Sequence, residues 1–189
     1  MRSMLWMAVV CAAIALTAHD ARAQGMSMGT FKGYLTGHVG AISGGDLTSD
    51  RLAGGASVSV QENTGWGAEL DFAHAEDAAS GRQVLDVTTY LVNASFVRPG
   101  GTIRPFAVVG AGILQVNGCD SPCNIPARTY DFAMNAGGGA FVAVNDMFGF
   151  RGDVRYIFSS GDHPDLHRPD NLSFWRASFG ITYMWSIAP

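Results

Sequence analysis

Three charged residues occupy every second position of one segment near the C-terminus: Arg151, Asp153 and Arg155. In a β-strand, residues two apart lie on the same face, so this spacing predicts a strand with one charged face. The alternate positions include Phe150 and Tyr156, which places aromatic rings on the other face. An arginine fork can bond two carboxylate oxygens at once, so the charged face is suited to a network of ion pairs.

Four further charged residues occupy equivalent positions in other alternating segments: Glu69, Asp71, Asp131 and Arg176. We expect all seven to face one interior, with the glycines at 137, 139 and 180 leaving room for the long arginine side chains. Opposite charges should pair there, because an unpaired buried charge is costly. The role predicted for this network is structural, and an ion path or a catalytic constellation is the alternative.

Cys119 and Cys123 are separated by three residues, and they are the two cysteines that follow the predicted leader. An exported chain with an even number of cysteines favours a disulfide, so we predict a small disulfide loop. A metal or redox site would need a second pair or a nearby histidine, which this segment lacks.

A second polar cluster comprises Asp162, His163, Asp165 and His167. Pro164 and Pro169 argue against the helix that would align the two histidines, so a solvated loop is favoured over a metal site. His38 is interpreted as a filler of the interior, and no spacing singles out a serine with His74 or His163 as a hydrolytic pair. We therefore predict no metal and no cofactor.

Eight alternating segments are positioned to carry these residues, and each is about ten residues long. The predicted strands are Phe31–Ile42, Leu52–Glu62, Trp66–His74, Val84–Val97, Ile103–Val116, Tyr130–Val142, Phe148–Phe158 and Leu172–Trp185. Long connections at 43–51, 75–83, 117–128 and 159–171 alternate with tight turns. Even strand number and this alternation of loops are typical of outer-membrane barrels, with the long loops outside the cell.

Aromatic residues on the apolar faces are predicted to form two rims of such a barrel. The periplasmic rim would contain Trp66, Phe106, Phe148, Tyr183 and Trp185, and the outer rim Phe72, Tyr130, Phe132, Tyr156, Phe158 and Trp175. Amphipathic rings favour the membrane interface. The pattern therefore predicts an all-β protein, an eight-stranded antiparallel up-and-down transmembrane β-barrel. A soluble barrel or sandwich with an aromatic core is the alternative.

The first 23 residues have the features of a secretory signal peptide. Arg2 precedes an apolar stretch from Leu5 to Leu16, and Ala21-Arg22-Ala23 forms a small-x-small cleavage site. We therefore expect a signal peptide at 1–23 and a barrel domain at 24–189. Charged residues are only 15% of the chain and Lys32 is its only lysine, so nucleic acid is not an expected partner.

Three motifs resemble the OmpA-like, opacity-type family of outer-membrane barrel domains. They are Thr102–Phe106 leading into Gly110–Gly112, the segment from Gly137 through Phe148 to Tyr156, and the closing segment Phe179–Trp185. The resemblance covers essentially all of residues 30–185. It implies an outer-membrane location in a Gram-negative bacterium, contact with outer-membrane lipid, and recognition of the closing strand by the barrel-assembly machinery.

The function expected from this pattern is that of a non-enzymatic membrane scaffold that displays four surface loops, with a role in adhesion or another interaction. Three alternatives remain open from the sequence: a narrow porin-like channel, a lipid-modifying surface hydrolase, and a soluble periplasmic barrel that binds a small ligand.

Overall fold

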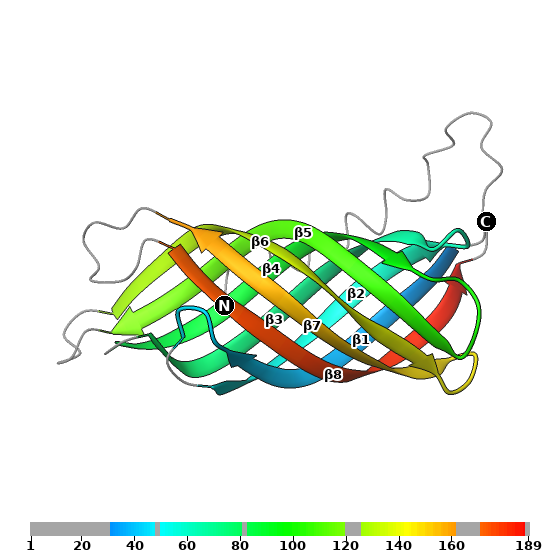
Figure 1. Cartoon of the computed structure of the whole chain (residues 1–189), viewed down its shortest axis with the longest axis horizontal. Helices are drawn as coiled ribbons and strands as arrows, with labels where there is room; N and C mark the ends of the chain where they lie inside the picture. The colour runs from blue at the N-terminus through cyan, green and yellow to red at the C-terminus, as the bar shows by residue number, and fades with distance from the viewer. Residues whose placement is uncertain (1–30, 48–49, 81–82, 120–125, 162–170, 188–189) are drawn as a thin grey trace, which may run out of the picture.

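The protein is a closed barrel of eight antiparallel strands, each paired with its neighbours in chain order (Figure 1). A computed structural model describes residues 31–47, 50–80, 83–119, 126–161 and 171–187. The strands are β1 (Phe31–Ser43), β2 (Arg51–Glu62), β3 (Trp66–Ser80), β4 (Gln83–Val97), β5 (Ile103–Cys119), β6 (Pro126–Ala143), β7 (Phe148–Ser160) and β8 (Asn171–Ile187). The predicted fold class is confirmed.

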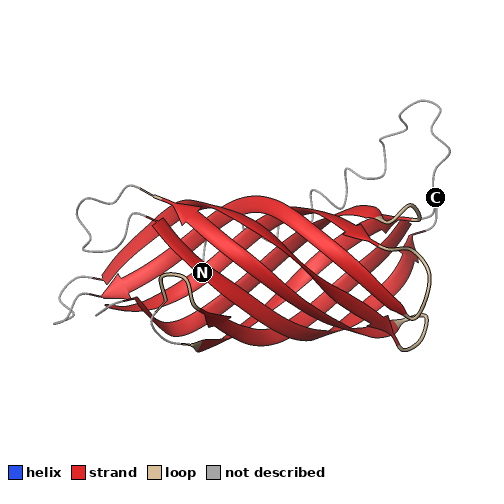
Figure 2. Ribbon diagram, in the orientation of Figure 1, coloured by secondary structure: helices blue, strands red, loops and turns tan. Residues whose placement is uncertain are grey.

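Strands alone build the barrel wall, and β1 closes it by pairing with β8 (Figure 2). Within the described residues there is no helix of the length and apolarity that crossing a membrane requires. The two ends of the barrel differ. We call the end that carries the connections 63–65, 98–102 and 144–147 the turn end, and the opposite end, at the left of Figure 1, the loop end.

Two of the three turn-end connections are tight because glycine supplies the backbone conformation that they require. Gly65 has a φ of 96° after β2, and its N–H donates to the carbonyl of Glu62 at 2.9 Å. Gly100 and Gly101, each with a φ of 81°, turn the chain between β4 and β5. A side chain at such φ angles would be strained, so these glycines fix where the strands reverse.

One long loop predicted from the sequence is largely strand in the structure, and another is strand at both of its ends. β3 continues to Ser80 and β4 begins at Gln83, so only residues 81–82 separate them. In the same way, β5 continues to Cys119 and β6 begins at Pro126. The prediction of a loop at 75–83 is therefore wrong. Alanine, aspartate and serine have low strand propensity, but inward packing of Ala75 and Ala78 in an apolar cluster overrides it.

The alternation predicted for the individual strands is present in the exposure of their side chains. β7 alternates between exposed and buried positions from Phe148 to Ser160, except that Gly152 is of intermediate exposure, and Arg155 is only 1% exposed. The outward side chains are large and apolar: Trp66 is 62% exposed and Ile181 is 59% exposed. The barrel is therefore apolar outside along most of its wall, and its charged side chains point inward.

The interior is layered along the barrel axis. In the described part of the chain, thirteen buried apolar residues form a cluster toward the loop end, among them Leu114, Ile157, Leu172 and Phe174. Charged and amide side chains fill the middle, and a second, smaller apolar cluster of Tyr34, Phe141 and Met184 lies toward the turn end. Side chains thus fill the interior of this eight-stranded barrel, as its narrow diameter allows.

Candidate functional site in the barrel interior

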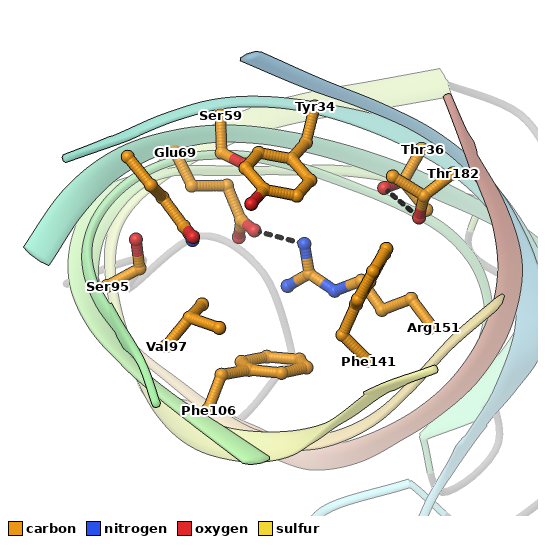
Figure 3. Close-up of a pocket in the computed structure, with 11 residues that line it drawn as sticks. Tyr34, Thr36, Ser59, Glu69, Ser95, Val97, Phe106, Phe141, Arg151 and Thr182 are labelled. Carbon is orange, nitrogen blue, oxygen red and sulfur yellow. Dashed lines mark hydrogen bonds and ion pairs between the residues drawn. The ribbon is translucent and has the colours of Figure 1, made fainter. Parts of the chain in front are cut away.

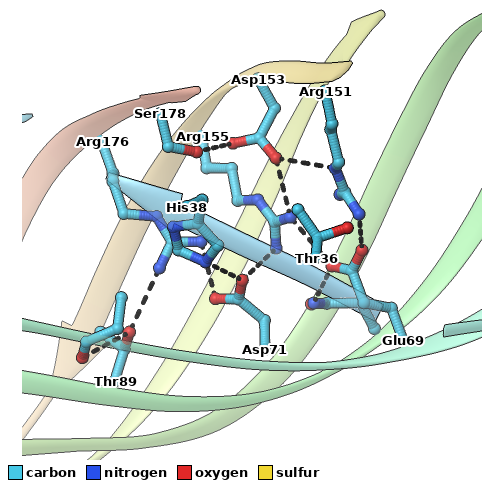
Figure 4. Close-up of polar contacts among 12 residues, drawn as sticks. Thr36, His38, Glu69, Asp71, Thr89, Arg151, Asp153, Arg155, Arg176 and Ser178 are labelled. Atoms are coloured by element: carbon cyan, nitrogen blue, oxygen red, sulfur yellow. Dashed lines mark hydrogen bonds and ion pairs between the residues drawn. The ribbon is translucent and has the colours of Figure 1, made fainter. Parts of the chain in front are cut away.

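Arg155 is the centre of the ion-pair network in the middle layer (Figure 4). Its Nη2 lies 2.9 Å from Glu69 Oε1 and 3.0 Å from Asp153 Oδ2, and its Nη1 lies 3.6 Å from Asp71 Oδ2. β7 supplies Arg155 and Asp153, whereas β3 supplies both other carboxylates from across the interior. One guanidinium group therefore joins opposite walls of the barrel.

Two further arginines complete the charge balance. Arg151 Nη1 lies 2.5 Å from Glu69 Oε2, and its Nε lies 3.3 Å from Asp153 Oδ2. Arg176 on β8 donates from Nη2 to Asp71 Oδ1 at 2.6 Å. Three guanidinium groups thus meet three carboxylates, so the described network has no net charge. This balance offsets much of the cost of removing six charges from water.

Uncharged groups hold the carboxylates and arginines in place. Asn93 Nδ2 donates to Glu69 Oε1 at 3.1 Å, and Ser178 Oγ donates to Asp153 Oδ1 at 2.8 Å. His38 Nε2 lies 3.4 Å from Asp71 Oδ2, which gives the predicted filler a specific neighbour. Gly137 is required beside Arg155, because a Cβ there would lie 2.8 Å from Arg155 Cγ.

Asp131 is buried, as its position on the charged face of β6 suggested. It lies beside Leu114 in the register of β5 and β6, nearer the loop end than the ion pairs of Arg155. The other six charged residues form the ion pairs around Arg151, Arg155 and Arg176. The sequence predicted the inward face of each, but the pairs follow from the register between strands.

The apolar cluster toward the loop end was not predicted, and it changes what the interior can do. Leu114, Ile157 and Leu172 are fully buried, and Phe174 is 1% exposed. Water and ions that reached the charged layer from the turn end would still face this packed apolar layer. The arrangement is therefore a closed plug within the described residues, with two kinds of barrier in series.

Phe106 corrects the predicted periplasmic rim. The sequence placed it on the outer wall, but it is buried in the interior. The Phe106 ring lies under the Arg151 guanidinium, with 4.4 Å from Arg151 Cζ to the ring centroid, a cation–π contact. The assignment failed because the outward face of β5 is apolar too, so alternation there gives no contrast.

The other rim aromatics point outward, and several pair across neighbouring strands. Toward the turn end, Phe148 packs on Tyr183 with ring centroids 5.5 Å apart. Toward the loop end, Phe72 packs on Tyr90 at 5.3 Å and Tyr156 on Trp175 at 5.0 Å. The remaining outward rim residues are Trp66, Trp185, Tyr130, Phe132 and Phe158.

The predicted disulfide and the loop histidines lie outside the described part of the chain. Cys119 ends β5, but Cys123 lies among residues 120–125, so the bridge stays a prediction. The cluster from Asp162 to His167 and the signal peptide at 1–23 are likewise outside. Among the described residues, no group of three or more His, Cys, Asp or Glu is arranged to hold a metal ion.

His74 has a hydroxyl partner that its sequence spacing did not reveal. Its Nδ1 lies 2.8 Å from Thr88 Oγ1 across the β3–β4 pair, and its Nε2 lies 3.8 Å from Glu76 Oε1. Thr88 is only 4% exposed, so its hydroxyl is covered by neighbouring side chains. We interpret the pair as a cross-strand contact that satisfies the histidine on the outer wall of the barrel.

These features define the class of the protein as a closed, plugged, eight-stranded up-and-down β-barrel. It is similar in fold to the crystal structure of Neisserial surface protein A, with a TM-score of 0.63 and 9% identity over 81% of this chain and 96% of that one. It is also similar to the N-terminal β-barrel domain of Pseudomonas aeruginosa OprF, with a TM-score of 0.59, 14% identity, and coverage of 84% and 100%.

A third similar structure is Ail, the attachment invasion locus protein of Yersinia pestis, in complex with the heparin analogue sucrose octasulfate. Its TM-score is 0.57, with 16% identity and coverage of 84% of this chain and 100% of that one. A scan against protein-family models finds no match, and a comparison with curated protein sequences finds no relative. At these identities the likeness is one of fold.

Proposed function

We propose that this protein is a non-enzymatic outer-membrane β-barrel of a Gram-negative bacterium. It is exported after cleavage of residues 1–23, and the barrel-assembly machinery inserts it through its closing strand. The observation that carries the proposal is the inside-out distribution of side chains: buried ion pairs surrounded by a wall of exposed Trp, Phe, Leu, Val and Ile. A soluble ligand-binding barrel requires the reverse distribution, with its apolar side chains inside.

The biochemical role follows from the plug. A barrel that is closed inside acts through its surface, so the wall serves as a rigid support for the loop-end connections outside the cell. We assign these connections an interaction role. Attachment is a candidate form of that role, since the solved barrel of similar fold from Yersinia pestis is named for attachment and invasion.

Membrane integration is tested by fractionation and by gel mobility. The mature protein should stay with outer membranes after washes with high salt and carbonate, because its apolar wall contacts lipid. In detergent, the unboiled protein should migrate differently from the boiled protein, since closed barrels resist unfolding by detergent. Recovery of the mature chain as a soluble monomer in buffer would remove the proposal.

Conductance separates the scaffold from the narrow channel. Pure wild-type protein in a planar bilayer should give no steady single-channel steps, because an ion would have to cross both the neutralised charge layer and the packed layer of Leu114, Ile157 and Leu172. The control is a known porin reconstituted in the same bilayer. Reproducible, sizeable steps from the wild type would favour the channel.

A further inference from the structure

The apolar outer wall of β3 and β4 is bounded by two aromatic pairs that lie close together along the strands. Trp66 packs on Phe96 toward the turn end, with ring centroids 5.1 Å apart, and Phe72 packs on Tyr90 toward the loop end at 5.3 Å. On each strand the two rings are six residues apart. Aromatic rings favour the two membrane interfaces, so the pairs mark the borders of an apolar stretch that we call the short wall.

The residues between the two aromatic pairs face outward and are apolar. Figure 3 shows Glu69 of β3 and Ser95 of β4 in the interior, so the positions on either side of each point to the outside. The outward residues are Ala68 and Leu70 on β3 and Val92 and Ala94 on β4, and all four are exposed. The apolar surface of this face therefore extends over only six residues of strand.

Polar residues follow directly beyond the loop-end border of the short wall. The next outward positions after Phe72 are His74 and Glu76, and Thr88 lies opposite His74 on β4. The side chain of Glu76 is 80% exposed, and that of His74 is 38% exposed. A hydrocarbon layer that rose to these positions would enclose an exposed carboxylate, which destabilises a barrel on its lipid face.

The wall formed by β7 and β8 is longer. On β7, Phe148 and Phe158 are ten residues apart, as are Trp175 and Trp185 on β8, and all four rings are exposed. At about 3.3 Å per residue and a strand tilt of about 40°, ten residues span about 25 Å across the membrane and six residues about 15 Å. An apolar band about 25 Å tall is usual for outer-membrane barrels, so the long wall matches the membrane and the short wall does not.

We infer that the short wall thins the membrane beside it, an inference that rests on the proposed function because it requires contact with lipid. The headgroups of the outer leaflet lie lower against β3 and β4 than against β7 and β8, where they contact His74 and hydrate the Glu76 carboxylate. Local thinning of the bilayer is a known response to a short apolar surface. Tilting of the whole barrel does not remove the mismatch, because it leaves the distance between the two borders of the wall unchanged.

The accessibility of backbone amides in the wild-type protein tests the inference without a substitution. Tyr156 is the internal control, because it lies eight residues from the turn-end ring of Phe148, just as His74 lies eight residues from Trp66. In nanodiscs of dimyristoylphosphatidylcholine, a water-soluble gadolinium chelate should broaden the NMR signal of the His74 amide several-fold more than that of Tyr156. A lipid with a nitroxide at the end of its acyl chain should do the reverse.

Three other results would overturn the inference, each for a different reason. Equal broadening of both amides by the nitroxide lipid, with equal shielding from the chelate, would indicate a membrane of uniform thickness. A His74 amide shielded from both probes would indicate that a second copy of the chain covers the short wall. Broadening of both amides by the chelate alone would place the chain outside the membrane and remove the proposed function as well.

A variant that lengthens the short wall tests whether its side chains set the thickness of the membrane. His74→Leu combined with Glu76→Leu extends the apolar face of β3 to ten residues, from Trp66 to position 76. The chelate should then broaden the amide of residue 74 no more than that of Tyr156, because hydrocarbon can rise against the added leucines. The matched control, His74→Gln with Glu76→Gln, should keep the accessibility of the wild type. If residue 74 of the leucine variant stays as accessible as in the wild type, the inference is wrong.

Discussion

Arg155→Ala should lower the free energy of unfolding by about 3–5 kcal/mol, the usual cost of removing one partner from a buried ionic network. Arg155 contacts Glu69, Asp71 and Asp153, and it is 1% exposed. Without it, the three carboxylates face only Arg151 and Arg176, so one buried negative charge has no positive partner. The change is measured by unfolding the protein in urea, with the gel mobility of the unboiled protein as the readout of the folded fraction.

The matched control is Arg98→Ala, because Arg98 is an exposed arginine beyond the end of β4. It should change the free energy of unfolding by less than about 0.5 kcal/mol, as is usual for surface substitutions. Arg155→Lys should fall between the two, since a lysine keeps the charge but lacks the fork that reaches several carboxylates. Equal stability of Arg155→Ala and Arg98→Ala would show that the network does not hold the barrel together.

Phe174→Ala should cost about 3–5 kcal/mol, as large-to-small changes of buried phenylalanines do. Phe174 is 1% exposed and belongs to the apolar cluster toward the loop end, where its removal would leave a cavity. The same unfolding measurement gives the value, and the same strand offers a phenylalanine on its other face for comparison.

That comparison is Phe179→Ala, which removes a ring that is 57% exposed on the outer wall of β8. Lipid or detergent can fill the space that the ring leaves, so the cost should be about 1 kcal/mol, comparable to its stacking on Phe150 at 5.7 Å. A larger loss for Phe179→Ala than for Phe174→Ala would mean that the two faces of β8 are reversed.

Alternation predicted the strands where the two faces differ most in chemistry. On β7, charge at Arg151, Asp153 and Arg155 contrasts with aromatic rings, and the structure has the predicted faces. On β5, Phe106 and Val108 lie inward while Val109 and Ile113 lie outward. Both faces are apolar, so the sequence pattern does not indicate which face points inward. The inward apolar cluster was missed for the same reason.

The ion pairs depend on geometry that a single strand does not contain. Glu69 and Arg155 belong to β3 and β7, which are not neighbours in the wall, so their contact follows from the diameter and register of the closed barrel. The extension of β3 to Ser80 and of β6 to Pro126 also depends on contacts with another strand. Pairing with an adjacent strand supports residues whose own propensity is low.

The closure of the barrel has a consequence for the order of folding. β1 pairs with β8 from Phe31↔Ile187 to Ser43↔Trp175, so the two ends of the sequence share one ladder of backbone hydrogen bonds. Contacts so distant along the chain are slow to form, because nearly the whole domain must be gathered before they can. Until β8 arrives, both β1 and the last strand in place present open edges, which invite pairing with other chains. The protein is therefore most exposed to aggregation just before β1 pairs with β8. A factor that keeps these open edges from pairing with other chains would act at this step.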